Sequence, residues 1–228
     1  MERRLEPEWL DTLPPHEPAA LRSRADLRRV NAVMGSAAIV ARALAAHAPP
    51  RPTTVVELGA GDGAWFASFV RRLPADWAGT RAVLLDRQDT VAARTLAELA
   101  QERWQPEVVT ADALEWLDQQ AAGSLPLVVA NLFLHHFDDV ALVHLFRRIA
   151  RAARWLVACE PRRSPVALAG SRVLGLIGCN AVTRHDAVVS VRAGFVDGEL
   201  SALWPGRVLE DRPRRLFSQC FVARGGGA

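Results

Sequence analysis

Three glycines alternate directly after an apolar run that ends in an acid. Val55-Val56-Glu57-Leu58 is followed by Gly59-Ala60-Gly61-Asp62-Gly63. A strand that ends in such a loop, just before a helix, presents bare backbone amides, because a Cβ there would block close approach of a ligand or forbid the turn. The loop therefore predicts a binding site for a nucleoside-bearing cofactor.

The glycine loop alone does not identify the cofactor. Gly59, Gly61 and Ala64 also satisfy the dinucleotide pattern G-x-G-x-x-[GA]. Asp86 ends a second apolar run, 23 residues after Gly63. An acid at that place can accept from both ribose hydroxyls of NAD or of S-adenosylmethionine, since both carry an adenosine. An NAD-dependent oxidoreductase is therefore one alternative.

Three other residues favour S-adenosylmethionine. Glu57 lies two residues before the first glycine, where it can orient the loop or receive a ligand's ammonium group. Asp112 follows a third apolar run and can accept from an adenine amino group. Asn131 ends a fourth run, and the loop after it would flank the sulfonium.

The order and spacing of these motifs resemble class I S-adenosylmethionine-dependent methyltransferases over roughly residues 50–223. The segments that carry the resemblance are 55–63, Asp86, 111–113, 131–136 and the Arg-Ala-Gly-Phe of 192–195. The His-His at 135–136 is similar to small-molecule members, whereas the Asn-Pro-Pro-Tyr of enzymes that methylate planar amino nitrogens is absent. The resemblance implies these cofactor-binding residues: Glu57, Gly59, Ala60, Gly61, Gly63, Asp86, Arg87, Asp112, Ala113, Asn131 and Leu132.

Three histidines are candidates for a catalytic base. A phenol or alcohol acceptor benefits from losing its proton, and histidine is the natural base near neutral pH. His135 and His136 directly follow the fourth strand, and His185 begins a later helix at the expected mouth of the acceptor pocket. No metal ligands are predicted, because Asp138-Asp139 is explained by capping of the following helix.

The long apolar segment 166–182 is either a buried helix or one wall of an apolar acceptor pocket. The sequence thus predicts a methyltransferase that O-methylates a small apolar phenolic or related natural product. Two alternatives stay open, namely C-methylation of a quinol or enol and a non-catalytic cofactor-binding module.

Composition indicates a single cytoplasmic domain. Half of the 228 residues are hydrophobic, and neither a secretory signal nor a membrane span is evident. The formal net charge is +3, but the 28 basic residues are all Arg and are spread among 25 acids, so no nucleic-acid partner is expected. Three cysteines without a C-x-x-C pattern indicate reduced thiols. The sequence leaves the oligomeric state open.

The hydrophobic pattern predicts an α/β, Rossmann-like, doubly wound seven-stranded sheet, mostly parallel with a C-terminal antiparallel hairpin. Residues 1–48 are predicted to form an N-terminal helical lid, broken near Gly35-Ser36. Residues 49–224 are the methyltransferase domain and 225–228 a flexible tail; the structure of 197–204 is left open. Strands are predicted at 53–58, 81–86, 106–110, 125–131, 154–160, 207–210 and 216–223, and helices at 63–73, 88–103, 112–121, 138–153 and 184–194.

Overall fold

A single mixed sheet organises the protein. The computed structural model describes residues 1–47 and 49–226, and its seven strands lie in the order β3-β2-β1-β4-β5-β7-β6. Strands β1 to β5 are parallel, and β7 runs antiparallel to both of its neighbours. The predicted fold class is therefore confirmed. The strands are β1 (Thr54–Leu58), β2 (Arg81–Asp86), β3 (Gln105–Thr110), β4 (Leu127–Asn131), β5 (Trp155–Pro161), β6 (Arg207–Arg214) and β7 (Ser218–Arg224).

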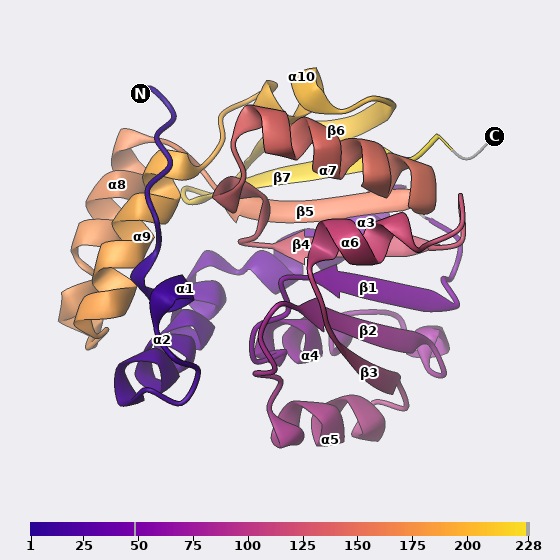
Figure 1. Cartoon of the computed structure of the whole chain (residues 1–228), viewed down its shortest axis with the longest axis horizontal. Helices are drawn as coiled ribbons and strands as arrows, with labels where there is room; N and C mark the ends of the chain where they lie inside the picture. Colours follow the sequence, from indigo (N-terminus) through magenta and orange to yellow (C-terminus); the bar gives the residue numbers. More distant parts are fainter. Residues whose placement is uncertain (48, 227–228) are drawn as a thin grey trace.

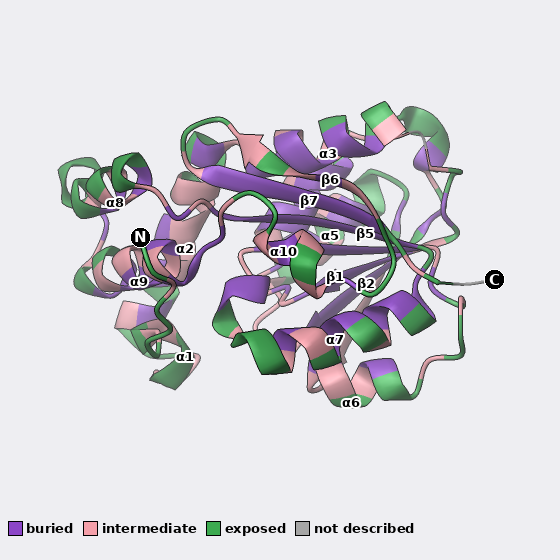
Figure 2. Cartoon of the chain, turned by 90° about the horizontal axis from the view of Figure 1, so that it is seen from above, coloured by how far each residue is buried: buried purple, intermediate pink, exposed green. Residues whose placement is uncertain are grey.

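Helices cover both faces of the sheet, because successive strand residues point to opposite faces. Val55, Leu84 and Val129 pack with α3 (Ser36–His47), α4 (Ala64–Val70) and α5 (Ala93–Gln101). Val56 and Val128 pack on the other face with α6 (Ala113–Asp118), α7 (Asp139–Ala152) and α10 (Glu199–Leu203). Figure 2 shows the buried sheet between these two exposed layers.

A third group of helices gathers beyond one end of the sheet (Figure 1). It comprises α1 (Trp9–Thr12), α2 (Pro18–Met34), α8 (Pro165–Arg172) and α9 (Ala181–Ala193). Helix α2 ends at Gly35, whose φ of 68° closes the last turn with an N–H that donates to the Asn31 carbonyl at 2.8 Å. The predicted break between the two N-terminal helices is therefore present.

The remaining short elements are the 3-10 helices η1 (Ala75–Trp77), η2 (Leu134–His136) and η3 (Leu174–Ile177). Two differences from the predicted elements have clear causes. The helix predicted from residue 88 begins only at Ala93, because residues 87–92 loop back to the glycine loop, where Thr90 Oγ1 donates to the Gly61 carbonyl at 2.8 Å. The strand predicted to end at residue 210 continues to Arg214, since β6 is an edge strand that tolerates Pro213.

The apolar segment 166–182 is not one helix. It divides into α8, η3 and the start of α9, with Gly178 in the left-handed region at φ 78°. Residues 197–204, left open by the sequence, contain α10. At the C-terminus the Gly225 and Gly226 amides donate to the Arg154 and Ala150 carbonyls. The rest of the predicted flexible tail, 227–228, and residue 48 of the predicted lid lie outside the described residues.

Among the described helices, no single one is long and apolar enough to cross a membrane. Helices α2 and α3 pass that test only as a pair, and they are bent by 48° at their break.

Candidate active site

The glycine loop follows β1 in the chain and is hydrogen-bonded to the carboxyl end of β2. The Gly59 and Ala60 amides donate to the Leu85 carbonyl at 2.9 and 3.0 Å. Gly59, Gly61 and Gly63 all have positive φ, between 54° and 73°, which side-chain-bearing residues rarely adopt. A Cβ on Gly59 would lie 2.4 Å from the Phe133 ring, whereas one on Gly61 would meet nothing within 4 Å. Gly59 is thus needed for packing, and Gly61 borders open space.

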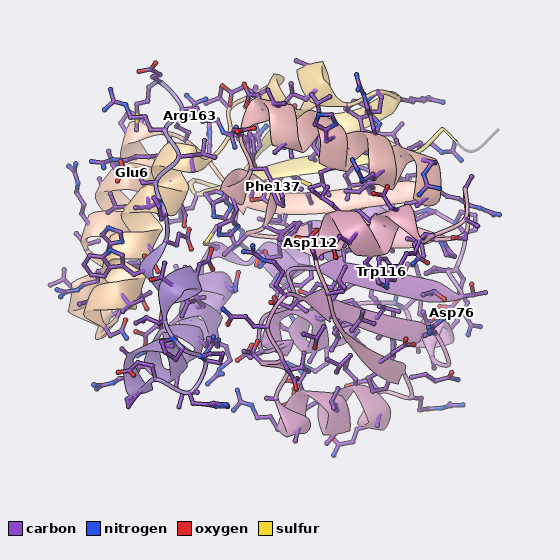
Figure 3. All side chains as sticks on the ribbon, viewed as in Figure 1. Glu6, Asp76, Asp112, Trp116, Phe137 and Arg163 are labelled. Atoms are coloured by element: carbon purple, nitrogen blue, oxygen red, sulfur yellow. The ribbon has the colours of Figure 1, made fainter. Side chains whose placement is uncertain are left out.

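Two carboxylates hold this edge of the sheet through backbone amides. Asp86 accepts from the Gly61 amide at 2.8 Å through Oδ2 and from the Gln88 amide at 2.9 Å through Oδ1. Asp112 begins α6, where Oδ1 accepts from the Leu114 amide at 2.8 Å (Figure 3). Each carboxylate oxygen has more than one lone pair, so both acids keep capacity to accept from a ligand.

Glu57 is buried at the end of β1 without a hydrogen-bond partner for Oε2 among the described residues. Burial raises the pKa of this carboxyl well above its usual range, and the nearby Asp86 and Asp62 carboxylates raise that pKa further. Asn131 Oδ1, at the end of β4, is likewise buried and unpaired within the described chain, whereas Nδ2 of the same side chain donates to Asn31 Oδ1 at 3.0 Å. Such orphan acceptors are costly unless a ligand satisfies them.

These residues surround a cleft of two adjoining cavities, of about 430 and 290 Å³, which we call the polar cleft. Every cofactor-binding residue predicted from the sequence except Gly63 lines it. A Cβ on Gly63 would lie 2.8 Å from Thr95, so this glycine serves the packing of α5. Two orphan acceptors for an ammonium, an acid for a ribose and an acid for an adenine amino group fit S-adenosylmethionine.

The N-terminal helices supply cleft residues that the sequence analysis did not identify. Leu10, Asp11, Arg24, Leu27, Arg28 and Asn31 line the polar cleft. Arg28 forms an ion pair with Asp62 of the glycine loop at 2.6 Å, and Arg24 donates to Gln88 at 3.0 Å. The sequence feature that could have identified them is the spacing of Arg24, Arg28 and Asn31, because it places these three polar residues on one face of α2.

A second, apolar pocket of about 270 Å³ lies between α2, α8, η3 and α9. Its walls include Val30, Val33 and Met34 on one side and Ala167, Val173, Leu174, Ile177, Ala187 and Val191 on the other. Segment 166–182 therefore does form a wall of a pocket. Leu27 and Leu132 line this apolar pocket and both cavities of the polar cleft.

Leu132 stands where the three cavities meet, and its backbone is strained. Its φ of 53° is in the left-handed region, which costs a non-glycine residue about 1 kcal/mol or more. The strained turn is held by the Leu132 amide, which donates to the Cys159 carbonyl of β5 at 3.0 Å. Strain of this kind is typical of positions that aim a side chain at a ligand.

Comparisons with known proteins agree with this architecture. Residues 55–155 match the family model described as a methyltransferase domain. This segment of the chain is thus similar to methyltransferase domains. The resemblance seen in the sequence is thereby confirmed. No curated protein matches the sequence.

Solved structures share the fold of this chain at low identity. An O-methyltransferase family protein from Burkholderia thailandensis matches with a TM-score of 0.62 and 17% identity, over 94% of this chain and 62% of its own. A 1,6-didemethyltoxoflavin-N1-methyltransferase from the same organism matches with a TM-score of 0.54 and 21% identity, over 98% and 93% of the two chains. Magnesium protoporphyrin IX methyltransferase from Synechocystis PCC 6803 matches with a TM-score of 0.54 and 14% identity, over 92% and 88%. The chain thus spans less than two thirds of the first of these proteins, and the likeness shows the fold.

The three histidines predicted as candidate bases lie in two places. His135 and His136, in η2, line the polar cleft, and His185 lines neither that cleft nor the apolar pocket. His185 stacks on Trp9 with 3.9 Å between ring centroids, and its Nδ1 lies 2.8 Å from Asp186. His185 therefore does not lie at the mouth of the apolar pocket, because the His185 ring contacts α1 instead.

His135 is 2% exposed and is held between two acids. Its Nδ1 lies 2.8 Å from Glu160 and its Nε2 3.3 Å from Glu8. Burial lowers the pKa of this imidazole, but the two carboxylates raise it more, to about 9. A ring whose two nitrogens both face carboxylates has no nitrogen left for an acceptor, so the structure does not support the predicted role of His135 as base.

His136 is more accessible than His135, but it too is engaged. Its Nδ1 donates to the Phe133 carbonyl at 3.0 Å, and its Nε2 lies 3.5 Å from Glu8 and 3.9 Å from Asp11. Glu8 was not identified from the sequence, because nothing in the pattern of residues 1–17 indicates that they cross to β4. The catalytic roles of His136 and His185 stay predictions.

Proposed function

We propose that this protein transfers a methyl group from S-adenosylmethionine to a small, largely apolar acceptor, most simply the hydroxyl of a phenol. One observation carries the proposal: the polar cleft, which fits the cofactor, meets the apolar pocket at Leu27 and Leu132. A donor in the first and an acceptor in the second would face each other across these two side chains.

The cofactor supplies an electrophilic methyl group when it is bound. Glu57 and Asn131 would hold its ammonium group, Asp86 the ribose hydroxyls, and Asp112 the adenine amino group. The two acids that would bind the ribose and the adenine are already positioned, because Asp86 and Asp112 are fixed by backbone amides. Arg28, by pairing with Asp62, would help α2 to close over the glycine loop.

The chain's main contribution to the reaction is alignment. Holding two reactants in line provides effective molarities of about 10⁵–10⁸ M in favourable cases. The apolar pocket presents only Ser171, Thr183 and Ser190 as polar residues, so it would fix the acceptor by shape and exclude water. Its volume of about 270 Å³ suits a single small aromatic ring system.

Residues 1–48 would act as a lid in this proposal. Leu10 and Asp11 of α1 and four residues of α2 line the cleft, so movement of these helices would change access to it. The cytoplasmic location and the absence of a nucleic-acid partner, both expected from the sequence, stay predictions.

The test is a transfer assay with methyl-labelled S-adenosylmethionine and a panel of small phenols, followed by mass spectrometry of the organic extract. We expect label in at least one apolar phenol, as a methyl ether. A product methylated on carbon would support the C-methyltransferase alternative. Cofactor binding without transfer to any acceptor would favour the non-catalytic module, and binding of NAD in its place would reject the proposal.

A further inference from the structure

A cluster of three side chains joins the N-terminal segment to the loop after β4. Glu8 lies just before α1, and His135 and His136 form the end of η2. One ligand atom from each of the three lies within 4.8 Å of the others. His135 Nε2 is 3.3 Å from Glu8 Oε1, and His136 Nε2 is 3.5 Å from Glu8 Oε2.

Each imidazole is oriented by the hydrogen-bond partner of its Nδ1 atom. His135 Nδ1 faces the buried Glu160 carboxylate at 2.8 Å, and His136 Nδ1 faces the Phe133 carbonyl at 3.0 Å. Each Nδ1 must therefore donate its hydrogen, because neither partner can. In the neutral rings, the Nε2 lone pairs then point at Glu8, where an acceptor faces an acceptor. A proton on each ring or a metal ion between the three side chains would remove this conflict.

A single divalent metal would satisfy both imidazoles at once. Two protons would instead create two imidazolium ions whose ring centroids are 4.2 Å apart, and these like charges would repel. Metal-bound histidines typically donate their other ring N–H to a carboxylate or a backbone carbonyl, and here one does each. Glu8 is itself held by the Ser190 hydroxyl, which donates to Oε1.

The spacing of the donor atoms also fits a metal. Bonds of about 2.0–2.1 Å at tetrahedral angles place ligand atoms roughly 3.3–3.4 Å apart. The distances from His135 Nε2 to Glu8 Oε1 and from His136 Nε2 to Glu8 Oε2, 3.3 and 3.5 Å, are each close to that edge, so a metal could use either or both oxygens of Glu8. Asp11 Oδ2, 3.9 Å from His136 Nε2, is the next oxygen and can complete the site directly or through water.

We propose that Glu8, His135 and His136 bind a divalent transition-metal ion of the Zn²⁺ type, which clamps the N-terminal segment onto the loop after β4. Two imidazoles and one carboxylate with a further open position are a ligand set of zinc sites, whereas Mg²⁺ prefers oxygen ligands. Because Glu8 and α1 are neighbours in the chain, the ion would fasten the helix that covers the polar cleft. The proposal does not depend on methyl transfer, since binding can be measured without cofactor.

Metal titration of the full-length protein tests this proposal. Protein stripped with a chelator is titrated with Zn²⁺ against a chromophoric competitor, and with Co²⁺ to read the ligand geometry from its absorption spectrum. We expect one ion per chain, a tetrahedral Co²⁺ spectrum and no competition by Mg²⁺. Wild-type protein that binds no stoichiometric ion would overturn the proposal.

Variants at Glu8 and His136 identify the site and leave the buried ring of His135 unsubstituted. Glu8→Gln and His136→Ala are expected to weaken Zn²⁺ binding at least about 100-fold, more than loss of an outer-shell partner usually does. Glu6→Gln, on the same segment, and His144→Ala, exposed on α7, are the matched controls and should bind as the wild type does. Equal losses in controls and ligand variants, or full retention in the ligand variants, would place any bound metal elsewhere.

Hydrogen exchange gives an independent measure of the clamp. Zn²⁺ should slow exchange of the Trp9 and Leu10 amides, which donate to Asp186 when α1 is docked. This protection should be absent in Glu8→Gln. Exchange that Zn²⁺ leaves unchanged in the wild type would show that the ion, if bound, does not fasten the N-terminal segment.

Discussion

The polar cleft and the apolar pocket meet at Leu27 and Leu132 but are built in different ways. The cleft is made largely from strand ends and tight turns, with side chains of α1 and α2 beside them, and its turns are fixed by backbone hydrogen bonds such as that from Gly61 to Asp86. The pocket is made from helix faces of α2, α8 and α9, and its walls are almost wholly apolar. The cleft thus offers a separate polar partner to each polar group of its ligand, whereas the pocket selects its ligand only by size and polarity.

This difference explains why the cofactor can be inferred more sharply than the acceptor. A buried acid such as Glu57, whose Oε2 has no hydrogen-bond partner among the described residues, indicates which kind of group its ligand must present. A wall of Val, Leu and Ile states only that the ligand is apolar, because dispersion and hydrophobic contacts are non-directional. Four variants would test whether the two sites are as separate as their construction indicates.

Asp86→Ala should have the largest effect, and it should fall on the cleft. The change removes a ligand contact and also the acceptor for the Gly61 and Gln88 amides. Hydrogen bonds to charged groups contribute about 1.5–3 kcal/mol each. We expect S-adenosylhomocysteine affinity to fall at least about 100-fold by calorimetry. Asp89→Ala, exposed three residues later, is the control; an affinity of Asp86→Ala close to that of the wild type would reject the ribose assignment.

Ala187→Phe should affect the pocket alone. Ala187 lines the apolar pocket, and the added ring would occupy the space proposed for the acceptor. Transfer should fall about tenfold or more, while cofactor affinity stays unchanged; extra bulk costs about 1–3 kcal/mol of folding free energy where the site cannot relax. Ala181→Phe, exposed at the start of the same helix, is the matched control. Equal loss of transfer in both variants would mean that the pocket is not the acceptor site.

Glu57→Gln should separate binding from stability. Since burial raises the pKa of Glu57 in the folded protein above its ordinary value of 4.5, folding favours the protonated carboxyl. The stability that this group contributes is full below pH 4.5 and is lost as pH rises towards the folded pKa, by at most about 1.4 kcal/mol per pH unit.

Urea unfolding between pH 5 and 8 measures this effect. The cofactor-free Glu57→Gln protein should be increasingly more stable than the wild type as pH rises, yet it should bind S-adenosylhomocysteine more weakly because the amide carries no charge for the ammonium. Glu102→Gln, exposed after α5, should show no such divergence. A variant less stable than the wild type at pH 8 would show that Glu57 is charged and paired in the folded protein.

The difference in construction between the cleft and the pocket also explains which residues could be predicted from the sequence. The cleft residues follow strands whose ends can be located from apolar runs, so Glu57, Asp86, Asp112 and Asn131 were identified together with their fold. In contrast, the sequence could not show that Pro213 lies in an edge strand, where a proline is tolerated, because the order of strands in the sheet is set by the tertiary structure.

Contacts between distant segments were beyond the sequence for the same reason. Glu8 meets His135 across 127 positions, and nothing local in either segment records the other. The sequence therefore suggested free imidazoles in the loop after β4, whereas Glu160 and Glu8 occupy both nitrogens of His135. A base inferred from its place in a motif has to be tested against such partners.

His185→Ala is the smallest expected change and bears on the last base inferred from position. His185 stacks on Trp9 and contacts Asp186, which also accepts from the Trp9 and Leu10 amides. Removing the ring should lower the free energy of unfolding by about 1 kcal/mol, the usual worth of an aromatic stack, and should change turnover less than threefold. Denaturant unfolding and the transfer assay measure the two quantities, with His144→Ala as the control. A loss of turnover of about 100-fold with unchanged stability would instead place His185 at the acceptor, and would require α1 to move away from His185 during the reaction.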